Sequence, residues 1–229
     1  MDTAQTLRYV DNRLLTMPPV ALMQVKKEIG HMISIVEENI ALSFASMESG
    51  TLEYGERISK NEERIDYTNS ALTSFLIKLS GNVDQSGDVI IGSYFHVLND
   101  LERIGDHAEN FHEIGMEMRG KKISFSETAL CELGQMKDRV MQMLLISKKA
   151  FRNMDKTQLS SLTALENEVD SMKKELTANH FARLAEGDCR IEVSPYYSSV
   201  VLGLERVADH LVNVGYSIVN PTGSQTDTE

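Results

Sequence analysis

The chain has 229 residues and a formal charge of −11 at pH 7, from 34 acidic and 23 basic side chains. A nucleic-acid-binding protein presents a basic stripe to the phosphates, so this acidic balance excludes a nucleic-acid partner. The 41% of hydrophobic residues suits a packed core, but no apolar run reaches the roughly 18 residues that a membrane-spanning helix needs.

Apolar residues recur at helical spacing along most of the chain, and no segment alternates with period two for long enough to indicate a sheet. Residues 1–17 are a linker, of which 7–15 suit a short helix. Pro18-Pro19 opens the first long helix, because proline fits a first helical turn, and Ser49-Gly50 ends it.

Polar segments separate the later helices from one another. They lie at 81–87, 120–126, 153–156 and 187–195. The sequence therefore predicts six long helices, followed by a polar tail at 221–229 that we expect to be disordered.

The second half of the chain repeats the first. Residues 101–110 read L-E-R-I-G-D-H-A-E-N, and residues 204–213 read L-E-R-V-A-D-H-L-V-N, 103 positions later. A shorter Glu-x-x-x-Asp pattern at 62–66 returns at 166–170, 104 positions later. Two independent motifs with nearly one offset indicate an internal duplication. We predict an all-α fold of two tandem antiparallel three-helix bundles, at 18–120 and 121–220.

Acidic residues four positions apart, which share one helix face, occur in four places. These pairs are Glu62/Asp66, Glu102/Asp106, Glu166/Asp170 and Glu205/Asp209. In an antiparallel hairpin, residues equidistant from the turn lie side by side. The first two pairs are equidistant from residue 84 and the last two from residues 187–188, both inside predicted turns. Two pairs should therefore meet at one level in each bundle.

Four carboxylates at one level repel each other unless they are protonated or bridged by cations. Oxygen-rich clusters suit Mg²⁺, Mn²⁺ or iron, and neighbouring imidazoles would also admit Zn²⁺. Helical phase turns the acidic stripe of the third and sixth helices away from their apolar face, which places a metal on the bundle surface. A solvated acidic surface is the competing interpretation of any single pair.

Other residues of the repeated motif have simpler interpretations. Arg103 and Arg206 suit a solvated face, and His107 and His210 suit surface or helix-capping roles. The two copies also differ, since Gly105 becomes Ala208 and Glu109 becomes Val212. Two metal sites could accordingly differ in occupancy.

The repeated E-R-x-x-D-H-x-x-N pattern, within residues 20–218, resembles the PhoU family of two tandem three-helix bundles. In that family, E/D-x-x-x-D motifs bind multinuclear metal clusters, often of iron or zinc, on the bundle surface. The resemblance implies ligand roles for the eight acidic residues of the pairs, with Asn110 and Asn213 as auxiliary ligands. It implies a metal-binding regulatory role in phosphate transport and homeostasis.

Residues 9–22, Y-V-D-N-R-L-L-T-M-P-P-V-A-L, resemble the stretch that follows the membrane region of bacterial sodium/phosphate cotransporter-like proteins. There a PhoU-like domain forms the cytoplasmic C-terminus, so the resemblance implies that this chain is the cytoplasmic regulatory part of such a protein. It implies a membrane phosphate transporter as partner, in cis or in trans. The alternative is a free-standing PhoU-type regulator that contacts an ABC transporter or a sensor kinase. A homo-oligomer stays open in both cases.

An enzyme is the other class considered, in the form of a ferritin-like di-metal oxidase. It needs Glu-x-x-His on two facing helices with inward ligands. Glu28-x-x-His31 and Glu109-x-x-His112 have that spacing, but they fall on the first and third helices, and we expect Glu28 to point away from the apolar stripe. Nothing resembles a nucleophile–base arrangement, so no catalytic residue is assigned.

Two cysteines, Cys131 and Cys189, lie far apart and in no metal-binding spacing. Reduced thiols of a cytosolic protein are the simplest interpretation. We expect a cytoplasmic location, either free or tethered to the inner face of the plasma membrane, because neither a membrane span nor a signal peptide is recognisable.

Overall fold

A computed structural model describes residues 6–49 and 51–219. Six long helices dominate it: α1 (Pro18–Ser49), α2 (Gly55–Ser80), α3 (Gln85–Gly120), α4 (Glu127–Asn153), α5 (Leu159–Glu186) and α6 (Ser194–Tyr216). The short 3-10 helices η1 (Asn12–Thr16) and η2 (Ile191–Val193) precede α1 and α6. Within these residues there is no strand, and the predicted all-α fold is confirmed. The predicted tail at 221–229 lies outside the described residues.

The helices start where local chemistry supplies a cap. Pro18 is the first residue of α1. Proline suits this position because the backbone N–H groups of a first helical turn have no partner within the helix, and proline has no N–H. Asp84 accepts a hydrogen bond from the backbone N–H of Gly87, and Ser126 accepts one from Ala129. The break predicted at 81–87 is therefore shorter in the structure, because the Asp84 cap starts α3 at Gln85.

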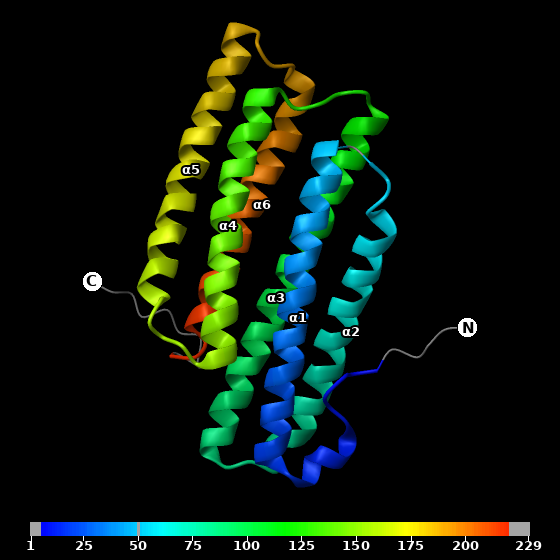
Figure 1. Ribbon diagram of the computed structural model, residues 1–229, viewed down its shortest axis with the longest axis vertical. Coiled ribbons are helices and arrows are strands. Elements are labelled where there is room, and N and C mark those ends of the chain that lie inside the picture. The colour runs from blue at the N-terminus through cyan, green and yellow to red at the C-terminus, as the bar shows by residue number, and fades with distance from the viewer. Residues whose placement is uncertain (1–5, 50, 220–229) are drawn as a thin grey trace.

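The helices form two three-helix bundles, α1–α3 and α4–α6, that pack side by side (Figure 1). Helix α3 packs against α6 and α1 against α4, while α2 and α5 lie on the outer flanks. Close approach of α3 and α6 needs Gly203, since a Cβ there would lie 2.6 Å from Cε1 of Phe111. Buried apolar residues of both bundles join in one core.

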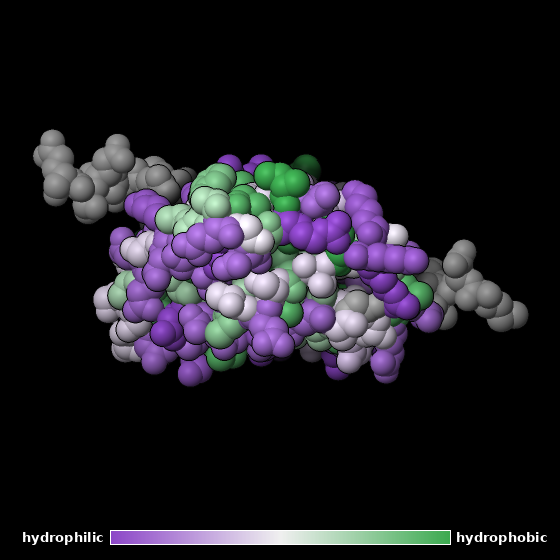
Figure 2. All heavy atoms as spheres, turned by 90° about the horizontal axis from the view of Figure 1, so that it is seen from above, coloured by the Kyte–Doolittle hydropathy of each residue, from purple (hydrophilic) through white to green (hydrophobic). Residues whose placement is uncertain are grey.

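This arrangement places the apolar faces toward the middle of the molecule. Seen from above, hydrophilic residues cover most of this end of the molecule, with patches of hydrophobic residues among them (Figure 2). None of the helices in the described part of the chain is both long and apolar enough to cross a membrane. The acidic residues of α2, α3, α5 and α6 therefore belong to helix faces outside the shared core or at its edge.

Candidate metal centre

The first carboxylate cluster lies where α2 packs against α3, and it comprises Glu62, Asp66, Glu102, Asp106 and Glu109. Oxygen Oε2 of Glu62 approaches the α3 backbone so closely that a Cβ built on Gly105 would lie 2.9 Å from it. Because Gly105 directly precedes Asp106, this contact puts the acidic pair of α2 level with that of α3. The two pairs meet as the helical spacing predicts.

Electrostatic repulsion is strong within the first carboxylate cluster. Glu62 is only 7% exposed. Its burial, together with the negative charges of the other four members, raises the pKa of Glu62 to about 8. The pKa values of Glu102, Asp106 and Glu109 are also raised, first by burial and then by neighbouring carboxylates. The cluster thus favours protons or cations that reduce its charge.

The buried amide of Asn39 forms a hydrogen bond with Glu62 from the core side of the cluster. Asn39 of α1 is fully buried, and its Nδ2 donates a hydrogen bond of 3.4 Å to Oε2 of Glu62. Within the described residues, Oε1 of Glu62 and Oδ1 of Asn39 have no hydrogen-bond partner. A buried oxygen left in this state is costly, and a cation would satisfy it. The chemistry of the cluster therefore fits a hard or borderline metal ion.

The position of Glu62 corrects one expectation. Asp66 and Asp106 are exposed, as a site on the bundle surface requires, but Glu62 is buried because Gly105 leaves room for its carboxylate. Among the described residues, no three His, Cys, Asp or Glu side chains stand close enough to hold one ion. Ligation of one ion by three or more of them therefore needs these side chains to rotate toward a shared position.

The second carboxylate cluster lies between α5 and α6, and it comprises Glu166, Asp170, Glu205 and Asp209. Burial and then the other three carboxylates raise the pKa of Glu166. Here, however, Nζ of Lys173 lies 2.6 Å from Oε1 of Glu205. The acidic pairs of α5 and α6 therefore also lie close together, and the ammonium group of Lys173 lies among them.

Both histidines of the repeated motif lie between the two bundles, with ring centroids 6.3 Å apart. Nδ1 of His210 lies 2.8 Å from Oδ1 of Asp100, which also accepts a 3.3 Å hydrogen bond from Nδ2 of Asn213. Burial lowers the pKa of His107, and the charges of His210 and Arg206 lower it further. The expected surface or capping role is wrong for His107 and His210, because the α3–α6 contact covers them.

The α3–α6 contact also holds one of the two predicted auxiliary ligands, Asn213. Asn213 directs its amide at Asp100 of the other repeat instead of the second carboxylate cluster, whereas Asn110 is exposed on α3. Sequence analysis missed Asp100, although it lies two residues before Glu102 and carries a charge into a helix contact. It also missed Asn39, a polar residue within the apolar stripe of α1.

The two Glu-x-x-His motifs do not share a site. Glu28 is fully buried, accepts a 2.7 Å hydrogen bond from the N–H of Tyr9 and pairs with Arg64 at 3.6 Å. His112 faces Ser46 of α1 through a 2.8 Å contact. Glu28 therefore lies eighteen residues below that level on α1, roughly 27 Å at 1.5 Å per residue. The ferritin-like arrangement is wrong for this chain.

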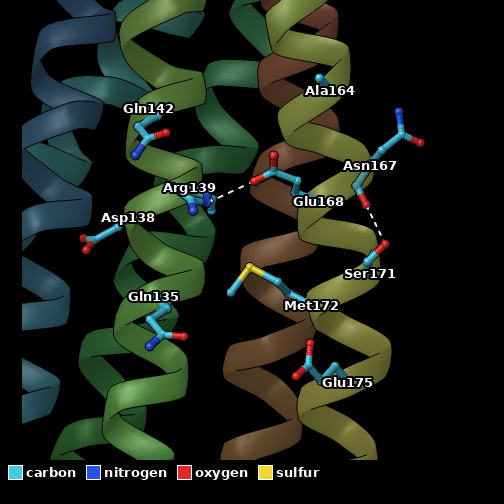
Figure 3. Close-up of a pocket in the computed structure, with 10 residues that line it drawn as sticks. All are labelled: Gln135, Asp138, Arg139, Gln142, Ala164, Asn167, Glu168, Ser171, Met172 and Glu175. Carbon is cyan, nitrogen blue, oxygen red and sulfur yellow. Dashed lines mark hydrogen bonds and ion pairs between the residues drawn. The ribbon is translucent and has the colours of Figure 1, made fainter.

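A polar groove runs between α4 and α5 (Figure 3). An ion pair of 3.1 Å between Arg139 and Glu168 crosses it, and Ser171 donates to the carbonyl of Asn167. We assign no ligand to the groove.

Known proteins are similar to this chain in sequence or in fold. The phosphate-specific transport system accessory protein PhoU homolog 1 of Thermotoga maritima is 24% identical over 211 residues, covering 86% of this chain and 85% of that protein. The PhoU homolog of Clostridium acetobutylicum is 24% identical over 212 residues, covering 90% and 94%. The crystal structure of the phosphate transport system regulatory protein PhoU from Streptococcus pneumoniae matches with a TM-score of 0.81 at 20% identity, covering 93% of this chain and 100% of that one.

The PhoU domain itself matches twice, over residues 29–114 and 133–218. Each match spans most of one three-helix bundle, so the duplication read from the sequence corresponds to two copies of this domain. Together the matches cover well over half of the residues, and the chain belongs to the PhoU family.

Proposed function

We propose that this chain is a non-enzymatic regulatory protein of a phosphate-specific transport system, and that it acts by docking on the transporter. The relatives named as accessory proteins of such systems match it through 85% and 94% of their own lengths. Their similarity therefore extends over both bundles. This favours a function that uses the whole two-bundle chain over a function of one isolated bundle.

We also propose that this chain binds metal ions at its acidic pairs, foremost at the first carboxylate cluster, and that iron or zinc is favoured over Mg²⁺ or Mn²⁺. The observation that carries this proposal is the buried Oε1 of Glu62, which has no hydrogen-bond partner among the described residues and lies beside four other carboxylates. A bound cation would neutralise their charge and cross-link the two helices. Glu62, Asp66, Glu102 and Asp106 would hold it in the first cluster.

Metal analysis of the purified chain tests this part of the proposal. Elemental analysis of wild type is compared with a Glu62→Gln/Asp106→Asn variant and with a Glu48→Gln/Glu186→Gln control, in which two exposed acids outside the clusters lose the same charge. We expect loss of metal in the first variant alone. Equal metal content in all three proteins would remove the proposed site.

Two versions of the docking function differ in where the transporter lies. A separate phosphate transporter, with or without a sensor kinase, is favoured by the whole-length similarity to accessory proteins. The cytoplasmic part of a sodium/phosphate cotransporter-like protein is supported by residues 9–22 alone. That segment packs on the first bundle, where Val10 is buried and the N–H of Tyr9 bonds to Glu28.

Binding assays separate the two versions. The full chain is mixed with the ATP-binding subunit of a phosphate-specific ABC transporter, or with a sodium/phosphate cotransporter membrane domain, each in detergent. Binding to the first, weakened by metal removal, is the result expected for an accessory regulator. Binding to the second alone would favour the cotransporter version, and binding to neither would overturn the docking proposal.

A further inference from the structure

We propose that the two carboxylate clusters are not equivalent: the first is the metal centre, and the ammonium of Lys173 takes the place of a metal ion in the second. This inference rests on the proposed metal binding and assigns it to one bundle. Four differences between matched positions of the two repeats carry it.

The first difference lies within the clusters. Lys173 follows Asp170 by three residues on α5, and its Nζ binds Oε1 of Glu205 across the helix contact at 2.6 Å. The matched position of α2 is Asn69, three residues after Asp66, and its Oδ1 accepts a hydrogen bond from Thr73 on its own helix. A lysine ammonium is a compact positive charge that repels a metal ion at the same carboxylates. The neutral Asn69 leaves the first cluster without such a group.

The second difference lies behind the clusters. Asn39 donates to Glu62 from the buried side, whereas Met143 occupies the matched position, 104 residues later, and is fully buried. Neighbouring positions support this alignment, since Val36 matches Val140 and Ser43 matches Ser147. The second repeat therefore presents a thioether where the first presents an amide, and it cannot donate a hydrogen bond to a carboxylate drawn inward.

The third difference concerns the space beside the glutamate. Gly105 lets Oε2 of Glu62 approach the α3 backbone, whereas Ala208 fills that position on α6 with a methyl group. Glu62 is accordingly buried, while its counterpart Glu166 is half-buried and open to water. A cation therefore stabilises the buried carboxylate of Glu62, whose Oε1 has no partner among the described residues, more than it stabilises the hydrated carboxylate of Glu166.

The fourth difference is the net charge of the clusters, and it also favours a metal ion in the first cluster. The first cluster has five carboxylates, because Glu109 joins the two pairs, and Val212 stands at the matched position of the second. The second cluster has four carboxylates and one lysine. Arg103 and Arg206 occupy matched positions in both repeats and do not alter this contrast. The first cluster therefore carries the larger uncompensated negative charge.

A reciprocal exchange of Asn69 and Lys173 tests the inference. Full-length Asn69→Lys and Lys173→Asn variants are equilibrated with Zn²⁺, or with Fe²⁺ under anaerobic conditions, and bound metal and affinity are measured by elemental analysis and calorimetry. Ser70→Lys and Lys174→Asn, at exposed neighbouring positions, give the same charge changes outside the clusters. Circular dichroism confirms that each variant is folded.

We expect Asn69→Lys to lose most of its bound metal, with at least a tenfold rise in the dissociation constant, or about 1.4 kcal/mol. Lys173→Asn should gain metal at the second cluster, and both controls should match wild type. The conservative Glu102→Gln/Asp106→Asn variant should lose the wild-type metal, whereas Glu205→Gln/Asp209→Asn should retain it.

Equal losses in these two double variants would overturn the inequivalence but leave metal binding intact. Unchanged metal in Asn69→Lys would overturn it as well. An absence of specific metal binding in wild type and in every variant would instead overturn the proposed metal function on which the inference rests.

Discussion

Nδ2 of Asn39 donates to Oε2 of Glu62 over 3.4 Å, and both side chains are buried where α1 meets α2. Replacing this amide by the residue of the second repeat, Asn39→Met, removes the protein donor to the Glu62 carboxylate that the described residues provide. We expect the metal-free variant to lose about 1–3 kcal/mol in the free energy of unfolding. Urea unfolding with a chelator at pH 8 measures this loss, and unchanged stability would show that the hydrogen bond contributes nothing.

The raised pKa of Glu62 makes the metal-free protein sensitive to alkali. A carboxyl whose pKa in the folded state is about 8, above its ordinary value of 4.5, stabilises the fold fully below pH 4.5. That contribution is lost as the pH rises through about 8, at roughly 1.4 kcal/mol per pH unit at most. Stability should thus fall from pH 5 to pH 8.5 more steeply in wild type than in Glu62→Gln.

Urea unfolding of the two metal-free proteins at pH 5, 6.5 and 8.5 checks this expectation. Because Glu102, Asp106, Glu109 and His107 also titrate, only the difference between wild type and variant reports on Glu62. A difference that stays constant with pH would contradict the assignment.

The absence of a side chain at Gly105 leaves room for the Glu62 carboxylate beside α3. In Gly105→Ala, the new Cβ would lie 2.9 Å from Oε2 of Glu62 and must displace that carboxylate. We expect metal affinity to fall about tenfold, by roughly 1.4 kcal/mol. Gly92→Ala is the matched control, because open space surrounds that position of α3. It should raise stability by about 0.5–1 kcal/mol through helix propensity and leave metal binding unchanged; equal metal affinity in both variants would contradict the proposed role of Gly105.

Removal of metal should lower stability. A ligand present at 100 times its dissociation constant stabilises the fold by about 2.7 kcal/mol, which for a chain of this size shifts the melting temperature by roughly 5–10 °C. Differential scanning calorimetry of metal-loaded and chelator-treated protein measures the shift. Glu62→Gln should show little shift, and a full shift in that variant would place the metal elsewhere.

The contact of Asp100 with His210 joins the two bundles and lies outside both carboxylate clusters. Asp100→Ala removes the 2.8 Å partner of His210, whose side chain is 13% exposed. We expect a loss of about 1–3 kcal/mol in stability, because a buried polar partner is left unpaired. Metal content should equal that of wild type in elemental analysis, and a large loss of metal would show that these residues serve the clusters.

Much of this architecture follows from residue spacing alone. Pro18, Asp84 and Ser126 start helices through local chemistry, and the equal intervals from Glu62 and Asp106 to residue 84 place their carboxylates at one level. The shared level needs only the rise of a helix and the position of a turn. The duplication, read from two offsets, likewise predicted a second cluster around Glu166 and Glu205.

Tertiary structure alone decided what surrounds those carboxylates. The burial of Glu62, its bond to Asn39, the reach of Lys173 to Glu205 and the contact of His210 with Asp100 all join different helices. Each depends on how far a helix is rotated about its own axis and on which neighbour it packs against. Residue spacing along one helix determines height and face, but the partner on that face is determined only when the helices pack together.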